Sequence, residues 1–450
     1  MICRIICLFF CITNLLFAAF TYPNYSEHKL DNGLRVLLIK DDYQPLIFMN
    51  LMIHTGELAD KKLGSVTLLS NLLDKGTKQF PGAEFNDFLS EKGSQFSVQS
   101  SSTYMLFTLS SLSEHFESSL TAVVDALVNA NLNESDFVQQ KHHLNVSLKE
   151  SMTDKSWLID YFSRKHLYEE SSLWSKSITL ETLDAIQLND VIFYYQNYIS
   201  PENATLVIKG DFSEEKLIKR LNMVFKPWNS AFSAQNYLEK NKIQTKDILF
   251  INKPGLTQAT IALYGSSEMY DSKLYPSFRL MNYMLGGGGF SSVLTEQVRA
   301  KKGLTYSIYS STSTDRLFSE HKIQTFTRNP EALKTIQTIQ DVLNMVKNDG
   351  FSEERLVKAK SFYRDYLPGQ MESPSFINQF ILLGLHKGLT IEEIYSRYDQ
   401  LLAVNLDDVM AVYTKHFKTS PVIVVLGDAT FLLTDIQRLG SVSVVNFQDL

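Results

Sequence analysis

The segment between Asn282 and Ser307 contains the side chains that could most readily do chemistry. It holds four consecutive glycines, Gly286 to Gly289, and Arg299 and Tyr306 follow them along the chain. A glycine run ahead of a helix can bind phosphate through exposed backbone N–H groups. Here no Gly-Lys-Ser/Thr sequence follows the run, and no strand–turn–helix unit with a downstream acidic residue surrounds it. The sequence therefore favours a flexible turn into a helix over a phosphate site.

Histidines that could bind a metal are scattered through the rest of the chain. His54 and Glu57 show His-x-x-Glu spacing, but they fall at the end of a predicted strand, where this spacing does not put both on one face. His142 and His143 are adjacent, so they point to different faces of their predicted helix. No Gly-x-Ser-x-Gly motif offers a serine nucleophile. We therefore expect no metal site built from this chain alone.

The first 19 residues have the layout of a secretory signal peptide. Arg4 precedes an apolar stretch from Ile5 to Phe17, and Ala18 and Ala19 provide small residues for cleavage. The alternative is an uncleaved membrane anchor, although so short a stretch spans a bilayer poorly. All three cysteines lie in this segment, so the mature chain would have neither a disulfide nor a reactive thiol: Cys3, Cys7 and Cys11. A net charge of −6 without a clustered basic run argues against a nucleic-acid partner.

The elements that must position these residues form one unit used twice. A Leu-x-Asp-Val helix start, a tyrosine and an apolar strand ending in Gly-Asp occur in both halves of the chain. Val191 and Val409 are 218 residues apart, as are Tyr195 and Tyr413. The near-constant offset predicts a duplicated domain of about 200 residues.

Each predicted half contains runs of strands and runs of helices. In the first half, strands are expected at 34–39 and 46–54, a helix at 64–73, paired strands around 96–98 and 105–109, and a helix at 116–127. In the second half, strands at 248–251 and 258–264 are expected to precede a long helix and strands near 306–311 and 321–327. Residues 229–247 are polar and aperiodic, which predicts a linker between domains at 20–228 and 248–450. This order indicates an α+β fold.

The glycine-rich segment resembles the C-terminal signature of the pitrilysin/mitochondrial processing peptidase family of inverzincin zinc peptidases. The matching order is Leu-Gly-Gly-Gly, Phe-Ser-Ser, x-Leu, Glu-x-Val-Arg and Lys-Gly-Leu-x-Tyr-Ser. The resemblance implies two homologous halves, each a mostly antiparallel sheet packed with helices. It also implies that Arg299 and Tyr306, seven residues apart, contact the substrate backbone and its developing oxyanion. A guanidinium and a phenol are suited to that role.

The family's zinc motif has lost its ligands in this chain. Gly64 and Lys75-Gly76-Thr77 match the sequence around the family's His-x-x-Glu-His helix, but Thr67, Ser70 and Asn71 stand where the two histidines and the glutamate belong. Hydroxyl and amide groups are poor zinc ligands, and a serine cannot replace the carboxylate that deprotonates water. Glu150 matches a third family ligand, but one carboxylate does not hold catalytic zinc. The resemblance therefore implies a degenerate site without metal.

We expect a substrate-binding subunit of an exported, two-subunit zinc peptidase, inactive alone. A homologous partner with an intact His-x-x-Glu-His motif would supply zinc in a heterodimer, and this chain would supply Arg299 and Tyr306. The expected location is the periplasm, with no stable membrane insertion after signal cleavage. Two alternatives stay open: a purely structural subunit, which would not need the Arg/Tyr pair, and an independent protease with an unorthodox metal site.

Overall fold

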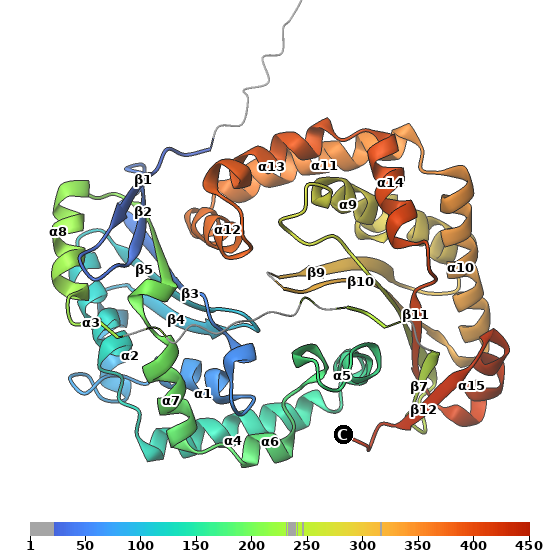
Figure 1. Cartoon of the computed structure of the whole chain (residues 1–450), viewed down its shortest axis with the longest axis horizontal. Coiled ribbons are helices and arrows are strands. Elements are labelled where there is room, and N and C mark those ends of the chain that lie inside the picture. The colour runs from blue at the N-terminus through green and yellow to red at the C-terminus, as the bar shows by residue number, and fades with distance from the viewer. Residues whose placement is uncertain (1–21, 231, 233–239, 241, 245–246, 316) are drawn as a thin grey trace, which may run out of the picture.

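A computed structural model describes residues 22–450 except 231, 233–239, 241, 245–246 and 316. Two six-stranded sheets, one in each half of the chain, organise the fold (Figure 1). The expected signal peptide at 1–19 lies outside the described residues, as does part of the expected linker at 229–247. Within the part of the chain that is described, no helix is long and apolar enough to cross a bilayer.

The first half contains a sheet in the order β1-β2-β6-β3-β5-β4, in which only the β2–β6 pair is parallel. Its strands are β1 (Ser26–Lys29), β2 (Arg35–Lys40), β3 (Leu46–Ile53), β4 (Gln95–Ser100), β5 (Met105–Leu112) and β6 (Ala204–Gly210). Its helices are α1 (Ser65–Leu72), α2 (Ala83–Glu91), α3 (Phe116–Val128), α4 (Glu134–Ser151), α5 (Lys155–Leu167), α6 (Leu180–Asp184), α7 (Leu188–Tyr198) and α8 (Glu214–Phe225).

The second half contains a sheet in the order β12-β7-β11-β8-β10-β9, in which β7 pairs in parallel with both β12 and β11. Its strands are β7 (Ile248–Asn252), β8 (Gln258–Gly265), β9 (Ile308–Thr314), β10 (Ser319–Arg328), β11 (Val422–Gly427) and β12 (Val442–Asn446). Its helices are α9 (Tyr275–Asn282), α10 (Ala332–Asp349), α11 (Glu353–Met371), α12 (Pro374–His386), α13 (Ile391–Ala403), α14 (Leu406–His416) and α15 (Ala429–Ile436). The α+β fold with two mostly antiparallel halves is thus confirmed.

The repeated sequence motif has a local structural cause in each half. Asp190 and Asp408 each stand at the third position of a helix and accept the backbone N–H of the residue that caps it, Gln187 or Asn405. Such reciprocal capping satisfies N–H groups that a helix start leaves unpaired. The repeated tyrosines are also equivalent, because Tyr195 donates to the carbonyl of Leu127 in α3 and Tyr413 to that of Leu343 in α10.

Each half lends one helix to the sheet of the other half. Helix α12 packs on β3 and β6, where Ile377, Ile381 and Leu382 join a buried cluster with first-half strand residues. Helix α5 packs on β7, β8 and β11 in the same way, through Leu158 and Ile159. Full burial of each such side chain contributes about 1.5–3 kcal/mol. The exchange covers both faces of each sheet, which explains why β6 and β11 are buried along their whole lengths.

Polar contacts within these exchanged regions also join the halves. Asn378 of α12 is fully buried and donates to the carbonyl of Phe48 at 2.9 Å and to Asn50 Oδ1 at 3.2 Å. At the other exchange, Asp160 of α5 accepts hydrogen bonds from the Tyr264 hydroxyl at 2.8 Å and from Lys322 Nζ at 2.9 Å. The halves are therefore held in register by directional bonds as well as by apolar burial.

The prediction of a long helix after β8 is wrong. Helix α9 ends at Asn282 after eight residues, and the chain continues as a π-helix, η4 (Tyr283–Gly287). The change of helix type falls three residues before the glycine run, whose first two glycines belong to η4. Single π turns inside helices occur frequently at functional sites.

Candidate functional site

Helix α1 carries the degenerate zinc motif, and its start is fixed by packing. Gly64, which precedes the helix, has a φ of +104°, and a Cβ there would lie 2.5 Å from Ile178 Cδ1. The left-handed backbone at this position favours glycine. The Asp60 carboxylate accepts the N–H groups of Gly64 at 3.0 Å and Val66 at 3.1 Å. Burial raises the pKa of Asp60 to about 7, although these N–H bonds oppose the shift.

The three substituted motif positions are engaged within the protein. Thr67 donates its hydroxyl to Glu57 Oε1 at 3.1 Å. Ser70 is buried and donates to the backbone carbonyl of Thr67 at 2.8 Å. Asn71 is half-buried on the same helix, and Glu150 is exposed near the end of α4, which packs against α1.

These residues do not fit zinc. Two hydroxyls already acting as donors, one amide and a single exposed carboxylate lack the imidazole groups that zinc sites use. Throughout the residues with described positions, no group of three or more His, Cys, Asp or Glu side chains is arranged to hold a metal ion. His54 and Glu57 are not brought together either, since His54 contacts His386 Nδ1 at 3.0 Å while Glu57 faces Thr67.

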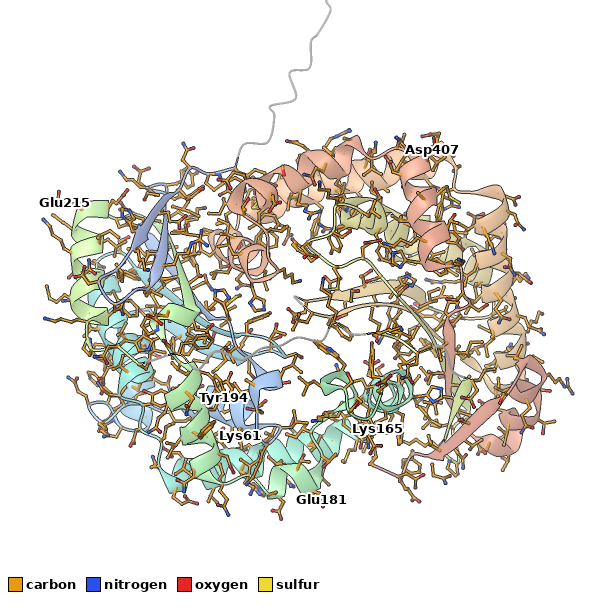
Figure 2. The ribbon with its side chains drawn as sticks, viewed as in Figure 1. Lys61, Lys165, Glu181, Tyr194, Glu215 and Asp407 are labelled. Atoms are coloured by element: carbon orange, nitrogen blue, oxygen red, sulfur yellow. The ribbon has the colours of Figure 1, made fainter. Side chains whose placement is uncertain are left out.

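A cavity of about 290 Å³ lies beside the degenerate motif. Its walls include Glu57, Gly64 and Thr67 from the first half's core and Trp157, Asp160 and Tyr161 from α5. Glu57 begins a short 3-10 turn, Glu57–Ala59, directly after Gly56, whose carbonyl accepts the Tyr194 hydroxyl at 3.3 Å; Tyr194 lies on α7 (Figure 2). The cavity has polar and aromatic walls without a metal-binding set. Sequence reasoning missed Glu57 as part of it, because only its spacing from His54 was informative.

The glycine run positions the second part of the site. A Cβ on Gly286 would lie 2.5 Å from Ser310 Cβ and 2.7 Å from Ser310 N, so the π-helix η4 packs directly on β9. Ser310 in turn contacts His321 Nε2 at 2.6 Å in a fully buried network. The expectation of a flexible turn is therefore wrong at Gly286, which is a tight packing position, although Gly289 does adopt a positive φ of +57°.

Arg299 and Tyr306 are brought together. Arg299 belongs to a second π-helix, η6 (Thr295–Lys301), and its guanidinium carbon lies 4.7 Å from the centre of the Tyr306 ring. It also lies 4.5 Å from the ring of Phe290, which sequence reasoning did not identify. Phe290 and Tyr306 are 79% and 75% exposed, so the guanidinium sits between two rings on the protein surface.

The charge of Arg299 is available to a ligand. In the described part of the chain Arg299 forms no ion pair, whereas the neighbouring carboxylate of Glu296 is already paired with Lys301 at 2.7 Å and with Arg355. Lys301 and Arg355 lower the pKa of Glu296, so this carboxylate stays ionised and paired. A guanidinium stacked between aromatic rings can donate to carbonyl or carboxylate oxygens in a fixed orientation.

The fold and this site define an inverzincin-type peptidase scaffold whose first half lacks the zinc ligands. Residues 35–171 match the profile of the insulinase family, peptidase family M16, and residues 185–363 match the profile described as the peptidase M16 inactive domain. The chain belongs to peptidase family M16.

Curated relatives and solved structures agree with this assignment. The non-peptidase homolog YmxG of Helicobacter pylori is 24% identical over 346 residues, covering 74% of this chain and 78% of its own. The uncharacterized zinc protease YmxG of Bacillus subtilis is 25% identical over 392 residues, covering 85% and 93%. The crystal structure of a peptidase M16 inactive domain from Pseudomonas fluorescens superposes with a TM-score of 0.83 at 19% identity, covering 90% of this chain and 98% of that one. This last likeness establishes the fold.

Proposed function

We propose that this chain is the non-catalytic, substrate-binding subunit of an exported two-subunit zinc peptidase that acts on peptides or unfolded proteins. The observation that carries the proposal is the contrast between the two parts of the site. Thr67, Ser70 and Asn71 cannot bind zinc, whereas Arg299 is held between two exposed rings with its charge unpaired among the described residues.

The chain's own residues would hold an extended peptide. Arg299 and Tyr306 present a guanidinium and a phenol, which suit a peptide carbonyl or the negative charge that develops on it. Strand β4 lies at the edge of the first sheet, with a largely exposed pattern of side chains. An edge strand can bind an extended segment by backbone pairing. Zinc and the general base would come from a homologous partner subunit with an intact His-x-x-Glu-His motif.

Two measurements test this proposal together. The chain is purified alone and with the candidate partner, and both preparations are assayed for peptide cleavage and for zinc by elemental analysis. We expect no cleavage and less than one tenth of an equivalent of zinc for the lone chain, and both cleavage and zinc for the complex. Cleavage by the lone chain that survives further purification, or stoichiometric zinc in it, would contradict the proposal.

A purely structural subunit is the competing outcome. It would bind the partner, but substitution of Arg299 would leave cleavage by the complex unchanged. Location is tested separately, by N-terminal sequencing of the protein from a fractionated cell. We expect the chain to begin near residue 19 or 20 and to be recovered from the periplasm of a Gram-negative host.

A further inference from the structure

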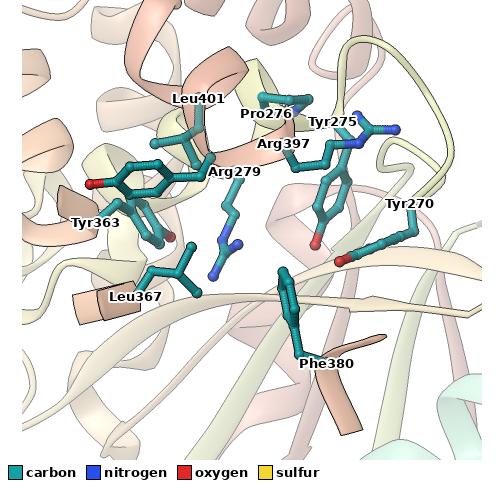
Figure 3. A pocket seen from close by; sticks show the side chains of 10 residues that line it. Tyr270, Tyr275, Pro276, Arg279, Tyr363, Leu367, Phe380, Arg397 and Leu401 are labelled. Atoms are coloured by element: carbon teal, nitrogen blue, oxygen red, sulfur yellow. The ribbon is translucent and has the colours of Figure 1, made fainter. Parts of the chain in front are cut away.

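A small cavity in the second half has an unusual combination of aromatic rings and arginines. It lies between α9, α11, α12 and α13, and it has a volume of about 30 Å³. Figure 3 shows Arg279 extending into it, with the neighbouring hydroxyls of Tyr270 and Tyr275 across the space from the guanidinium and the Phe380 ring below. The Arg279 guanidinium and the two tyrosine hydroxyls therefore face one small space, whereas the Arg397 guanidinium points away from it (Figure 3).

The positive charge around this cavity has no carboxylate partner. Arg279 stacks on Tyr363 at 4.5 Å, and the groups that act on its ionisation are tyrosines. Arg397 donates to two backbone carbonyls, those of Ser272 at 2.7 Å and Asp271 at 3.0 Å, and its Nε is buried without a hydrogen-bond partner. Neither guanidinium forms an ion pair with any carboxylate of the described residues. A buried charge without a counter-charge is costly unless an anion is bound beside it.

A third cation adds to the same field. Burial lowers the pKa of Lys387, while Asp315 opposes the shift and Arg279 adds to it. The Lys387 ammonium lies 4.6 Å from the ring of Tyr270. Arg279 therefore acts on Lys387 as a like charge, and a bound anion would relieve that repulsion.

The size and the hydrogen-bond donors of the cavity select the ligand. A space of this volume holds about two water-sized groups, which matches the two oxygens of a carboxylate. Burial raises the pKa of Tyr270 to about 12, so its hydroxyl remains a neutral donor. A guanidinium fork and phenol donors match carboxylate oxygens in geometry. Phe380 forms an apolar wall of the same space.

The cavity occupies the second-half counterpart of the degenerate zinc site. Tyr161 of α5 lines the first-half cavity and Phe380 of α12 lines this one, and the two residues are 219 positions apart on equivalent exchanged helices. Gly64, which precedes α1, lines the first-half cavity, and Tyr275, the first residue of α9, lines this one. The duplicated fold thus builds a pocket twice, with unlike chemistry in its two copies.

We infer that Arg279, Tyr270 and Tyr275 form a binding site for a carboxylate group. The inference goes beyond the proposed peptidase role and does not depend on a partner subunit. The carboxylate can belong to a small free acid or to the C-terminus of a peptide, and the two sources are separable by experiment.

The test uses the full mature chain and three probes in calorimetric titrations: sodium acetate, N-acetyl-trialanine with a free C-terminal carboxylate, and its C-terminal amide. We expect the free acid to bind at least tenfold more tightly than the amide. Competition by acetate at comparable concentration would show that a small free acid suffices, while much weaker competition would identify the peptide end as the source. Equal binding of acid and amide, or equal competition by phosphate, would overturn the inference.

Variants locate the binding. Arg279→Gln is expected to weaken binding of the free acid at least tenfold, and Tyr270→Phe, which removes only a hydroxyl, at least threefold. Arg438→Gln is the matched control, because Arg438 is exposed and pairs with Asp435 at 3.1 Å. It lies in η8 (Gln437–Leu439), which does not line the cavity. If Arg279→Gln fails to fold, Tyr270→Phe and Tyr275→Phe decide the question, and unchanged binding in both would overturn the inference.

Discussion

Replacing Arg299 by alanine should separate activity from stability. The guanidinium lies 4.5 Å from the Phe290 ring and 4.7 Å from the Tyr306 ring, and both rings are exposed. At exposed positions each cation–π contact contributes about 0.5–1 kcal/mol, so the two together contribute at most about 2 kcal/mol. Because solvent can replace these contacts, we expect the free energy of unfolding to fall by no more than about 1 kcal/mol.

The effect on cleavage should be much larger. If Arg299 donates to the developing oxyanion in the assembled peptidase, its removal should lower kcat/KM by about 10²–10³-fold, which corresponds to about 2.7–4 kcal/mol of transition-state stabilisation. Phe290→Ala keeps the charge but removes one stacking surface. We expect a smaller loss, about two- to fivefold, from the roughly 0.5–1 kcal/mol of lost orientation.

The assay is cleavage of a quenched fluorescent peptide by the reconstituted complex, with urea unfolding of each variant measured in parallel. Arg328→Ala is the matched control, since Arg328 is exposed and pairs only loosely with Glu331 at 3.7 Å. An Arg299→Ala complex that keeps more than a third of the wild-type kcat/KM would refute the reasoning. So would a loss of activity that follows the loss of stability, because the effect would then be structural.

Three further outcomes are expected. Asn378→Leu should lower the free energy of unfolding by about 1–3 kcal/mol in urea titrations, because it leaves Asn50 Oδ1 without its donor in a buried contact between the halves; an unchanged free energy of unfolding would contradict this. Burial raises the pKa of Glu268, but hydrogen bonds from His416 and Lys415 outweigh burial and lower this pKa to about 2. The resulting stabilisation of the fold is complete above the ordinary pKa of 4.5 and should be lost as the pH falls from there to about 2. A Glu268→Gln variant should lack this loss of stability at low pH. Combined Thr67→His, Ser70→Glu and Asn71→His substitutions should bring about one equivalent of zinc into the lone chain by elemental analysis, because residues four apart share a helix face; absence of zinc would show that α1 has also lost the required geometry.

The repeat and the α+β class were predictable because they depend on local chemistry. The Asp190 and Asp408 caps and the Tyr195 and Tyr413 hydrogen bonds use the same residues at the same offsets, so the duplication is visible in the sequence itself. The family resemblance singled out Arg299 and Tyr306 as substrate-contacting residues, and the structure brings the two side chains together.

The exchange of α5 and α12 was not predictable from the same patterns. Their apolar spacing shows that each helix has a buried face, but it does not show which sheet that face covers. Phe290 was missed for a related reason. It follows a glycine run that is typical of a turn, and its contact with Arg299 depends on how the chain runs between η4 and η6, which the sequence pattern does not specify.

Packing of the core explains why helix α1 of the degenerate motif is kept, but it does not explain the arrangement of Arg299 and Tyr306. On α1, Val66, Leu68, Leu69 and Leu72 are fully buried, so the helix and its Gly64 start are needed by the core whether or not zinc is bound. The half-buried positions of Thr67 and Asn71 can change at little cost in stability, so an intact helix is no sign of catalysis. Arg299, Phe290 and Tyr306 are the opposite case. They are held in a defined stack on the surface, where they contribute little to the core. A ligand is therefore the better physical reason for their arrangement than folding.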